Sequence, residues 1–240
     1  PARAIDAQCD EILRVILGDP KNFEMEAVEA LAAVSSEEIA RHVELVTGLL
    51  TSTYQEIRDA AAAALRKASS EKARFYDLAY HGDLQKAKKL AGAMEYARKG
   101  LQARHPLNVR VVSALILAEA KDKESAVNIG EVFQAMLTEA KNRYNWEAFR
   151  ASTLFSWIQQ MTELLGAWKD PVANEVLLKG MFGPYYAIRG FSAKALAAAG
   201  DKANFRAVFS SVEESLGKGT AWREDIMTAL EALADASQTA

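Results

Sequence analysis

Helix-breaking residues are rare in this chain of 240 residues, which contains only 13 glycines and 5 prolines. Alanine is abundant, and few stretches alternate polar and apolar residues with the period of two that marks a half-buried strand. Half of the residues are apolar and a quarter are charged, which provides enough apolar surface for a continuous core. We therefore predict an all-α protein in which helices occupy most of the chain.

Six segments share one arrangement of apolar residues. Their first positions are Phe23, Ile57, Val109, Phe149, Ile188 and Trp222, and their ninth positions are Leu31, Leu65, Leu117, Trp157, Leu196 and Leu230. Between them lie mostly small or compact residues: Ala27, Ala61, Ser113, Thr153, Ser192 and Ile226. Because residues three, four and seven apart share one face of a helix, we predict that each segment is a helix with its large residues in the core.

The ninth positions recur at intervals of 34, 52, 40, 39 and 34 residues, close to the period of helical repeats. A turn signal and another amphipathic stretch precede each segment. We predict about six antiparallel helix pairs, each burying its apolar face against the next, and hence a single repeat domain over residues 1–240. A longer helix over about 83–103 would account for the interval of 52.

An apolar residue followed by arginine recurs at the start of five segments: Ile57-Arg58, Val109-Arg110, Phe149-Arg150, Ile188-Arg189 and Trp222-Arg223. With the small residues and the leucine that follow, this pattern resembles the second helix of a HEAT repeat, and armadillo-like solenoids are similar. The resemblance implies a right-handed α-solenoid whose second helices line a concave face that usually binds proteins. HEAT repeats commonly place an aspartate six residues before the arginine, whereas this chain has Ser52, Arg104, Tyr144, Gly183 and Gly217.

The arginine column supplies the first candidate binding residues, which are Arg110, Arg150 and Arg189. Planar guanidinium groups in one groove could bind carboxylates or phosphates. The alternative is structural: each arginine would bind the turn carbonyl groups or the helix end of the neighbouring repeat.

A basic segment over residues 86–110 supplies a candidate polyanion site, with Lys86, Lys88, Lys89, Arg98, Lys99 and Arg104. Glu95 is its single acidic residue. A stripe of apolar residues on the same helix would turn most of these cations to solvent. The alternative is an ordinary solvated face.

Aromatic residues gather after residue 140. Four of them fall at turns or in first helical turns, where amphipathic rings can anchor a partner: Tyr144, Trp146, Tyr185 and Tyr186. Packing between repeats is the alternative explanation.

No residue pattern predicts a catalytic, metal or cofactor site. Cys9 is the only cysteine, and the three histidines are far apart in the sequence. Phosphate-binding and nucleophile-elbow motifs are absent from the sequence. No apolar run approaches the roughly 20 residues that would cross a membrane, so we expect a cytoplasmic protein, with a cleaved signal or an excised domain as alternatives.

Three functions are compatible with this sequence. We expect a scaffold that binds a polypeptide partner on the concave face. The alternatives are nucleic-acid or polyanion binding through residues 86–110, and a HEAT-like lyase or glycosylase. The net charge of −3 argues against a surface that binds nucleic acid as a whole. The oligomeric state is left open.

Overall fold

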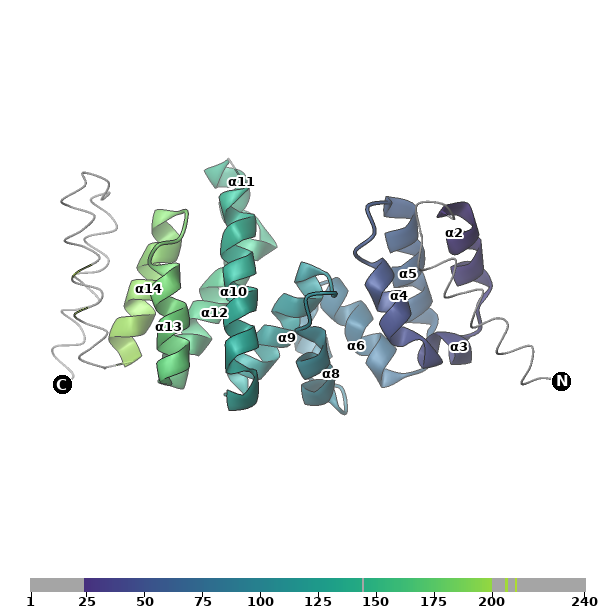
Figure 1. The fold of residues 1–240 in the computed structure, drawn as a ribbon, viewed down its shortest axis with the longest axis horizontal. Coiled ribbons are helices and arrows are strands. Elements are labelled where there is room, and N and C mark those ends of the chain that lie inside the picture. The colour runs from purple at the N-terminus through teal and green to yellow at the C-terminus, as the bar shows by residue number, and fades with distance from the viewer. Residues whose placement is uncertain (1–23, 144, 200–205, 207–209, 211–240) are drawn as a thin grey trace. The chain divides into compact units, whose positions relative to one another are not determined.

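The computed structural model describes residues 24–143 and 145–199, together with Arg206 and Ser210. Within these residues every regular element is a helix, as predicted (Figure 1). The contacts divide the chain into two compact units, with the boundary between Ile116 and Leu117. This boundary lies inside one continuous helix, α9 (Leu107–Glu119). The single domain over residues 1–240 stays a prediction.

The first unit is built around α5 (Gln55–Lys67), which packs against four other helices. Its buried face carries Ile57, Ala61 and Leu65, all completely shielded from solvent. The other helices of this unit are α2 (Glu24–Ala33), α3 (Ser36–Arg41), α4 (Val43–Leu49), α6 (Glu71–Tyr80), α7 (Leu84–Ala87) and α8 (Ala93–Gly100).

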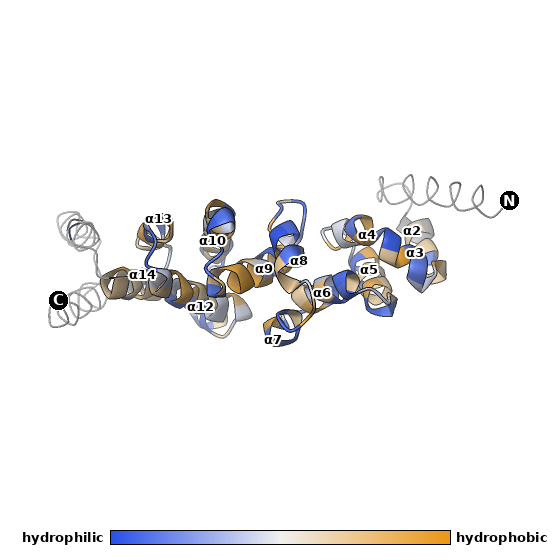
Figure 2. Ribbon diagram, turned by 90° about the horizontal axis from the view of Figure 1, so that it is seen from below, coloured by the Kyte–Doolittle hydropathy of each residue, from blue (hydrophilic) through white to orange (hydrophobic). Residues whose placement is uncertain are grey.

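The second unit has two layers of helices (Figure 2). One layer contains α10 (Ala126–Lys141) and α13 (Pro171–Gly180), which contact each other, and the other contains α12 (Thr153–Trp168) and α14 (Tyr186–Ala199). The short helices η1 (Lys123–Ser125) and α11 (Trp146–Arg150) complete its described part. Trp157 and Trp168 are buried in this unit, and all four tryptophans of the chain follow residue 117.

Glycine allows the closest approach between α12 and α14. A Cβ atom added at Gly166 would lie 2.9 Å from the Cβ atom of Ala195 and 3.0 Å from its backbone. Such distances are too short for real carbon atoms, so only glycine lets these two helices meet here.

The predicted core columns are buried wherever the structure describes them, with one exception. Val109, Phe149, Ile188 and Leu196 are completely buried, and Ala27, Ser113 and Ser192 are equally inaccessible. Thr153 is exposed instead. Phe23, Trp222, Ile226 and Leu230 lie outside the described residues.

The exposure of Thr153 follows from a break inside the predicted helix over 149–157. The short helix α11 ends at Arg150, and Ser152 takes an extended conformation and caps α12 by accepting a hydrogen bond from Phe155 N. Thr153 is therefore the first residue of a new helix, and this position faces solvent.

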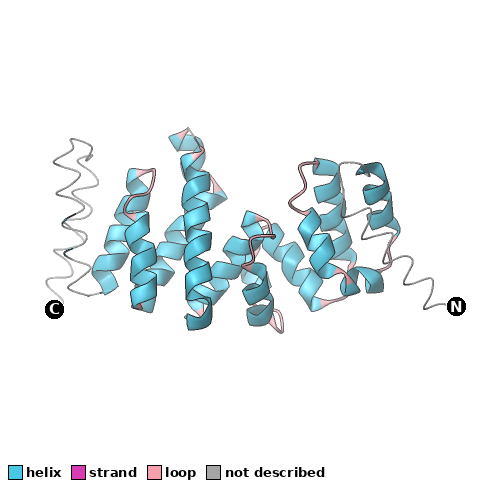
Figure 3. Cartoon of the chain, viewed as in Figure 1, coloured by secondary structure: helices cyan, strands magenta, loops and turns pink. Residues whose placement is uncertain are grey.

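The prediction of one long helix over residues 83–103 is wrong. Figure 3 shows helices and loops in the described part of the chain, and this region contains two short helices, α7 and α8. Gly92, between them, has a φ of 78°, a left-handed conformation that is incompatible with a continuing α-helix. The turn uses glycine where the sequence pattern predicted an uninterrupted helix.

Candidate functional site

Arg58 donates a hydrogen bond to the carbonyl group of a turn residue six positions before it. The Nη1 group of Arg58 donates to Ser52 O at 2.5 Å, across the six residues that separate an aspartate from an arginine in HEAT repeats. A second guanidinium nitrogen donates to the side chain of Gln55. Both contacts lie within the turn and helix that Arg58 itself belongs to, and they favour a structural role for this arginine.

The three arginines predicted to bind a partner have different surroundings. Arg110 is half-buried in α9 within the first unit, and Arg189 is half-buried in α14 within the second unit. Arg150 is exposed at the end of α11, so it does not open a long second helix as predicted. Their role in binding stays a prediction.

Five aromatic side chains of the second unit form one cluster, defined by Trp146, Phe149, Phe155, Tyr185 and Phe191. The ring centroids of Trp146 and Tyr185, two predicted anchor residues, are 5.2 Å apart. Tyr185 stacks on the buried Phe149 at 4.6 Å, and its hydroxyl group donates to Arg143 O.

These contacts make the aromatic cluster a packing element as well as a partly accessible surface. Trp146 and Tyr185 are each half-buried. Tyr144 and the side chain of Tyr186 lie outside the described residues, so these two anchor residues stay predictions.

A groove of about 930 Å³ runs along α12 and α14. It is lined by Gln159, Thr162, Glu163, Gly166, Ala167, Lys169, Ala187, Gly190, Phe191, Lys194, Ala195 and Ala198. We call it the α12–α14 groove. Half of its lining residues are alanine or glycine, so a ligand could approach the backbone of both helices closely.

Three charged side chains, one acidic and two basic, line the α12–α14 groove. Glu163 accepts a hydrogen bond from Gln159 Nε2 at 3.2 Å. Lys169, at the end of α12, and Lys194, on α14, are both exposed. Within the described part of the chain, neither lysine forms an ion pair. No sequence motif marks this groove; its signal is the spacing of small residues on two helices.

Acidic groups neutralise part of the basic segment 86–110. Lys86 Nζ lies 2.7 Å from Asp83 Oδ2, and Lys99 Nζ lies 2.6 Å from Glu95 Oε1. Arg104 Nη2 lies 2.7 Å from Glu44 Oε2, on a helix distant in the sequence. Lys89 and Arg98 are exposed, and Lys88 is half-buried. The segment therefore carries less uncompensated charge than its sequence suggests.

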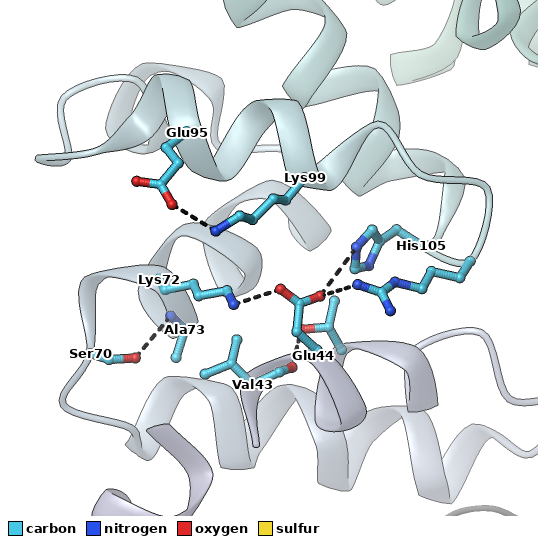
Figure 4. Close-up of polar contacts among 10 residues, drawn as sticks. Val43, Glu44, Ser70, Lys72, Ala73, Glu95, Lys99 and His105 are labelled. Carbon is cyan, nitrogen blue, oxygen red and sulfur yellow. Dashed lines mark hydrogen bonds and ion pairs between the residues drawn. The ribbon is translucent and has the colours of Figure 1, made fainter. Parts of the chain in front are cut away.

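Glu44 is the centre of an ionic cluster in the first unit (Figure 4). Its Oε1 atom lies 2.5 Å from Lys72 Nζ on α6, and its Oε2 atom contacts Arg104 and lies 3.8 Å from His105 Nε2. Burial opposes ionisation of Glu44, but the hydrogen bond and charge of Lys72, with the charge of Arg104, lower its pKa overall. Sequence reasoning missed this cluster because its members are far apart in the chain.

His105 and Tyr76 form a buried stacked pair beside Glu44. Their ring centroids are 5.2 Å apart with an interplanar angle of 25°. Neither nitrogen of His105, nor the hydroxyl group of Tyr76, makes a hydrogen bond with the described residues. Burial, only partly opposed by Glu44, lowers the pKa of His105 to about 4, so the ring is neutral at neutral pH.

Among the described residues, no three His, Cys, Asp or Glu side chains are grouped closely enough to bind a metal ion. No helix in those parts of the chain has the length and hydrophobicity required to span a membrane. Comparison with models of known protein families and with curated proteins found no match for this sequence.

Proposed function

We propose that this protein is a HEAT-like scaffold that binds a polypeptide segment of a partner protein in the α12–α14 groove. The observation that carries the proposal is the groove itself, with its small residues and its accessible charges. Its volume of about 930 Å³ falls within the range typical of ligand-binding clefts. Helices provide a rigid support for such a site.

The chemistry of the α12–α14 groove favours a polypeptide as the ligand. Glycine and alanine on both walls leave room for a backbone and for apolar side chains, as in complexes where a helix or an extended segment binds a groove. Phe191 belongs both to the groove and to the aromatic cluster, so the partner could also contact Tyr185 and Trp146 at this end. Aromatic residues of this kind often dominate binding energy.

Polyanion binding through residues 86–110 is the less favoured alternative. Lys86, Lys99 and Arg104 already contact carboxylates, and counterion release requires cations that are available to phosphates. No observation on the described residues favours the lyase or glycosylase alternative.

Selection from a displayed library of random short peptides tests the proposed function. We expect the full chain to enrich a family of related peptides. Ala167→Trp, which places a bulky ring in the groove at an exposed position, should abolish that enrichment. The matched control is Gln134→Trp, at an exposed position of α10 that does not line the groove, and it should leave enrichment unchanged.

Two results would count against the proposed function. In the first, the wild-type chain enriches no peptide family. In the second, Ala167→Trp enriches the same peptides as the wild-type chain, which would place binding outside the groove. Circular dichroism of each variant confirms that the helices are retained.

A further inference from the structure

Two lysines of the second unit adopt a backbone conformation that usually belongs to glycine. Lys121 has a φ of 55° and Lys169 has a φ of 57°, and they are the only non-glycine residues with positive φ among those the structure describes. Lys121 follows the end of α9, and Lys169 caps the end of α12. A left-handed conformation costs about 1–2 kcal/mol for a residue with a Cβ atom, so the chain tolerates strain at both positions while keeping a lysine.

Both lysines lie at one end of the α12–α14 groove. Lys121 Nζ donates to Ala167 O at 3.0 Å, and Ala167 and Lys169 both line the groove. Lys194, from α14, lines the same groove and precedes Ala195, which packs against Gly166 near the same end of α12. We call the two groove-lining lysines, Lys169 and Lys194, the lysine rim; Lys121 lies beside it. The neighbouring Lys123 is already paired, with its Nζ atom 3.8 Å from Asp170 Oδ2.

The rim and the groove differ in charge and in polarity. Lys121 offsets the negative end of the α12 dipole through its hydrogen bond to Ala167 O. Lys169 and Lys194 are exposed and form no ion pair among the described residues, so both are available to an anionic group. One helical turn before Ala167, Glu163 would repel a second acidic group. The groove between consists mainly of alanine, glycine and Phe191.

We propose that the lysine rim recognises carboxylates at one end of the bound segment, whose small apolar side chains occupy the groove. The partner is thus a polypeptide with an acidic end and an apolar body, bound in one direction. This inference rests on the proposed function and adds to it the chemistry and the orientation of the partner. Complementary charge of this kind contributes to specificity and to the rate of association.

Two biased libraries of short displayed peptides serve as probes. Both carry Ala, Gly, Val and Leu over most of their length; one ends in Asp and Glu, and the other ends in Asn and Gln. On the wild-type chain we expect the acid-ended library to be enriched about tenfold over the amide-ended one, the ratio that about 1.4 kcal/mol of charge-assisted contact would produce.

Substitutions at the rim separate recognition from folding. Glycine adopts positive φ freely, so Lys169→Gly should retain or raise the melting temperature while it removes the charge. In the double variant Lys169→Gly with Lys194→Gln, the preference for acidic ends should fall to near parity, with amide-ended peptides still retained. Lys179→Gln, at an exposed lysine of α13 that does not line the groove, is the control and should keep the full preference.

Each contrary outcome identifies what is wrong. Equal enrichment of both libraries on the wild-type chain would overturn the lysine rim as a carboxylate site and leave the proposed function standing. Enrichment of acid-ended peptides that survives Ala167→Trp would place the acidic contact elsewhere and also overturn the inference. If short single-stranded DNA displaced the bound peptides and bound the rim more tightly than they do, the lysine rim would be a nucleic-acid site, and the inference would be overturned. Retention of neither biased library, together with failure of the random-library selection, would reject both proposals.

Discussion

Glu44 connects three segments of the first unit through one carboxylate. Lys72 from α6, with Arg104 and His105 from the segment after α8, all lie within 4 Å of it. About two thirds of its side-chain surface is shielded from solvent. These contacts are therefore less screened than those of a surface ion pair.

We expect Glu44→Gln to lower the free energy of unfolding by about 1–2 kcal/mol at neutral pH, because it removes charge-assisted hydrogen bonds that are only partly solvated. Urea denaturation followed by circular dichroism measures this change. Glu95→Gln is the control: it breaks the exposed pair with Lys99 and should have a much smaller effect. Equal effects of the two substitutions would contradict this view of the cluster.

The same substitution should change the pH dependence of stability. The pKa of Glu44 is lowered on folding, so its contribution is complete above the ordinary carboxyl value of 4.5 and disappears as the pH falls below the folded-state pKa. The stability difference between wild type and Glu44→Gln should therefore vanish in acid. A difference that persists unchanged at the lowest pH where the protein folds would argue against this assignment.

His105 should make the free energy of unfolding depend on pH over a higher range than Glu44 does. Its pKa falls from 6.5 to about 4 on folding, so protons bind preferentially to the unfolded chain and stability decreases as the pH falls through this window. Glu44 opposes this shift, whereas Arg104, Lys72 and Arg110 reinforce it.

Replacement by phenylalanine isolates this effect. We expect His105→Phe to keep the stack on Tyr76, to leave stability at pH 7 within about 1 kcal/mol, and to flatten the pH dependence between 6.5 and 4. Denaturation midpoints of both proteins across this range provide the measurement. An unchanged slope in the variant would show that another group titrates.

At the scale of the helices, substitution by alanine should have opposite effects on stability at two glycines. Gly166 lies where α12 meets α14, so Gly166→Ala should destabilise the protein by about 1–3 kcal/mol through overpacking. Gly48, in α4, has no atom within 4 Å of the added Cβ, so Gly48→Ala should stabilise it by up to about 1 kcal/mol. Thermal denaturation of both variants tests the pair, and a stabilising Gly166→Ala would refute the close approach.

The helix content and the core columns could be predicted from the sequence because both depend on local periodicity. Ile57, Ala61 and Leu65 share a buried face simply because they are four residues apart on one helix. The break before Thr153 could have been suspected from Ser152, a good capping residue, but the apolar pattern runs through it without interruption. The apolar pattern likewise continues past Gly92, so it does not indicate the left-handed turn there.

The candidate site was less predictable, because it depends on pairs of residues distant in the sequence. The position of Trp146 and Tyr185 in turns predicts that each is an anchor residue, but it does not indicate that the two rings contact each other, as they do in the structure. The α12–α14 groove arises where two helices approach at Gly166 and Ala195, which no spacing within a single helix could indicate. The charge of the basic segment was overestimated because Glu44 is 60 residues from Arg104.

At the scale of the whole molecule, α9 is the element that crosses the boundary between the two units. Helix formation is cooperative, so a helix that continues through the boundary should couple the folding of the two units, and we expect one cooperative unfolding transition for the chain. Glu44→Gln in the first unit and Gly166→Ala in the second should therefore shift the same transition in hydrogen-exchange and denaturation measurements. Two separate transitions, each moved by only one substitution, would show that the units unfold independently.

The distribution of tryptophans gives this chain a built-in optical asymmetry. Because all four indole rings follow residue 117, emission excited selectively in tryptophan reports on the environment of the second unit, whereas far-ultraviolet ellipticity sums over both units. A peptide arriving beside Trp146 or Phe191 would alter that emission without any added dye. The first unit contains tyrosine but no tryptophan, so a single tryptophan introduced there would make its own behaviour visible under the same excitation.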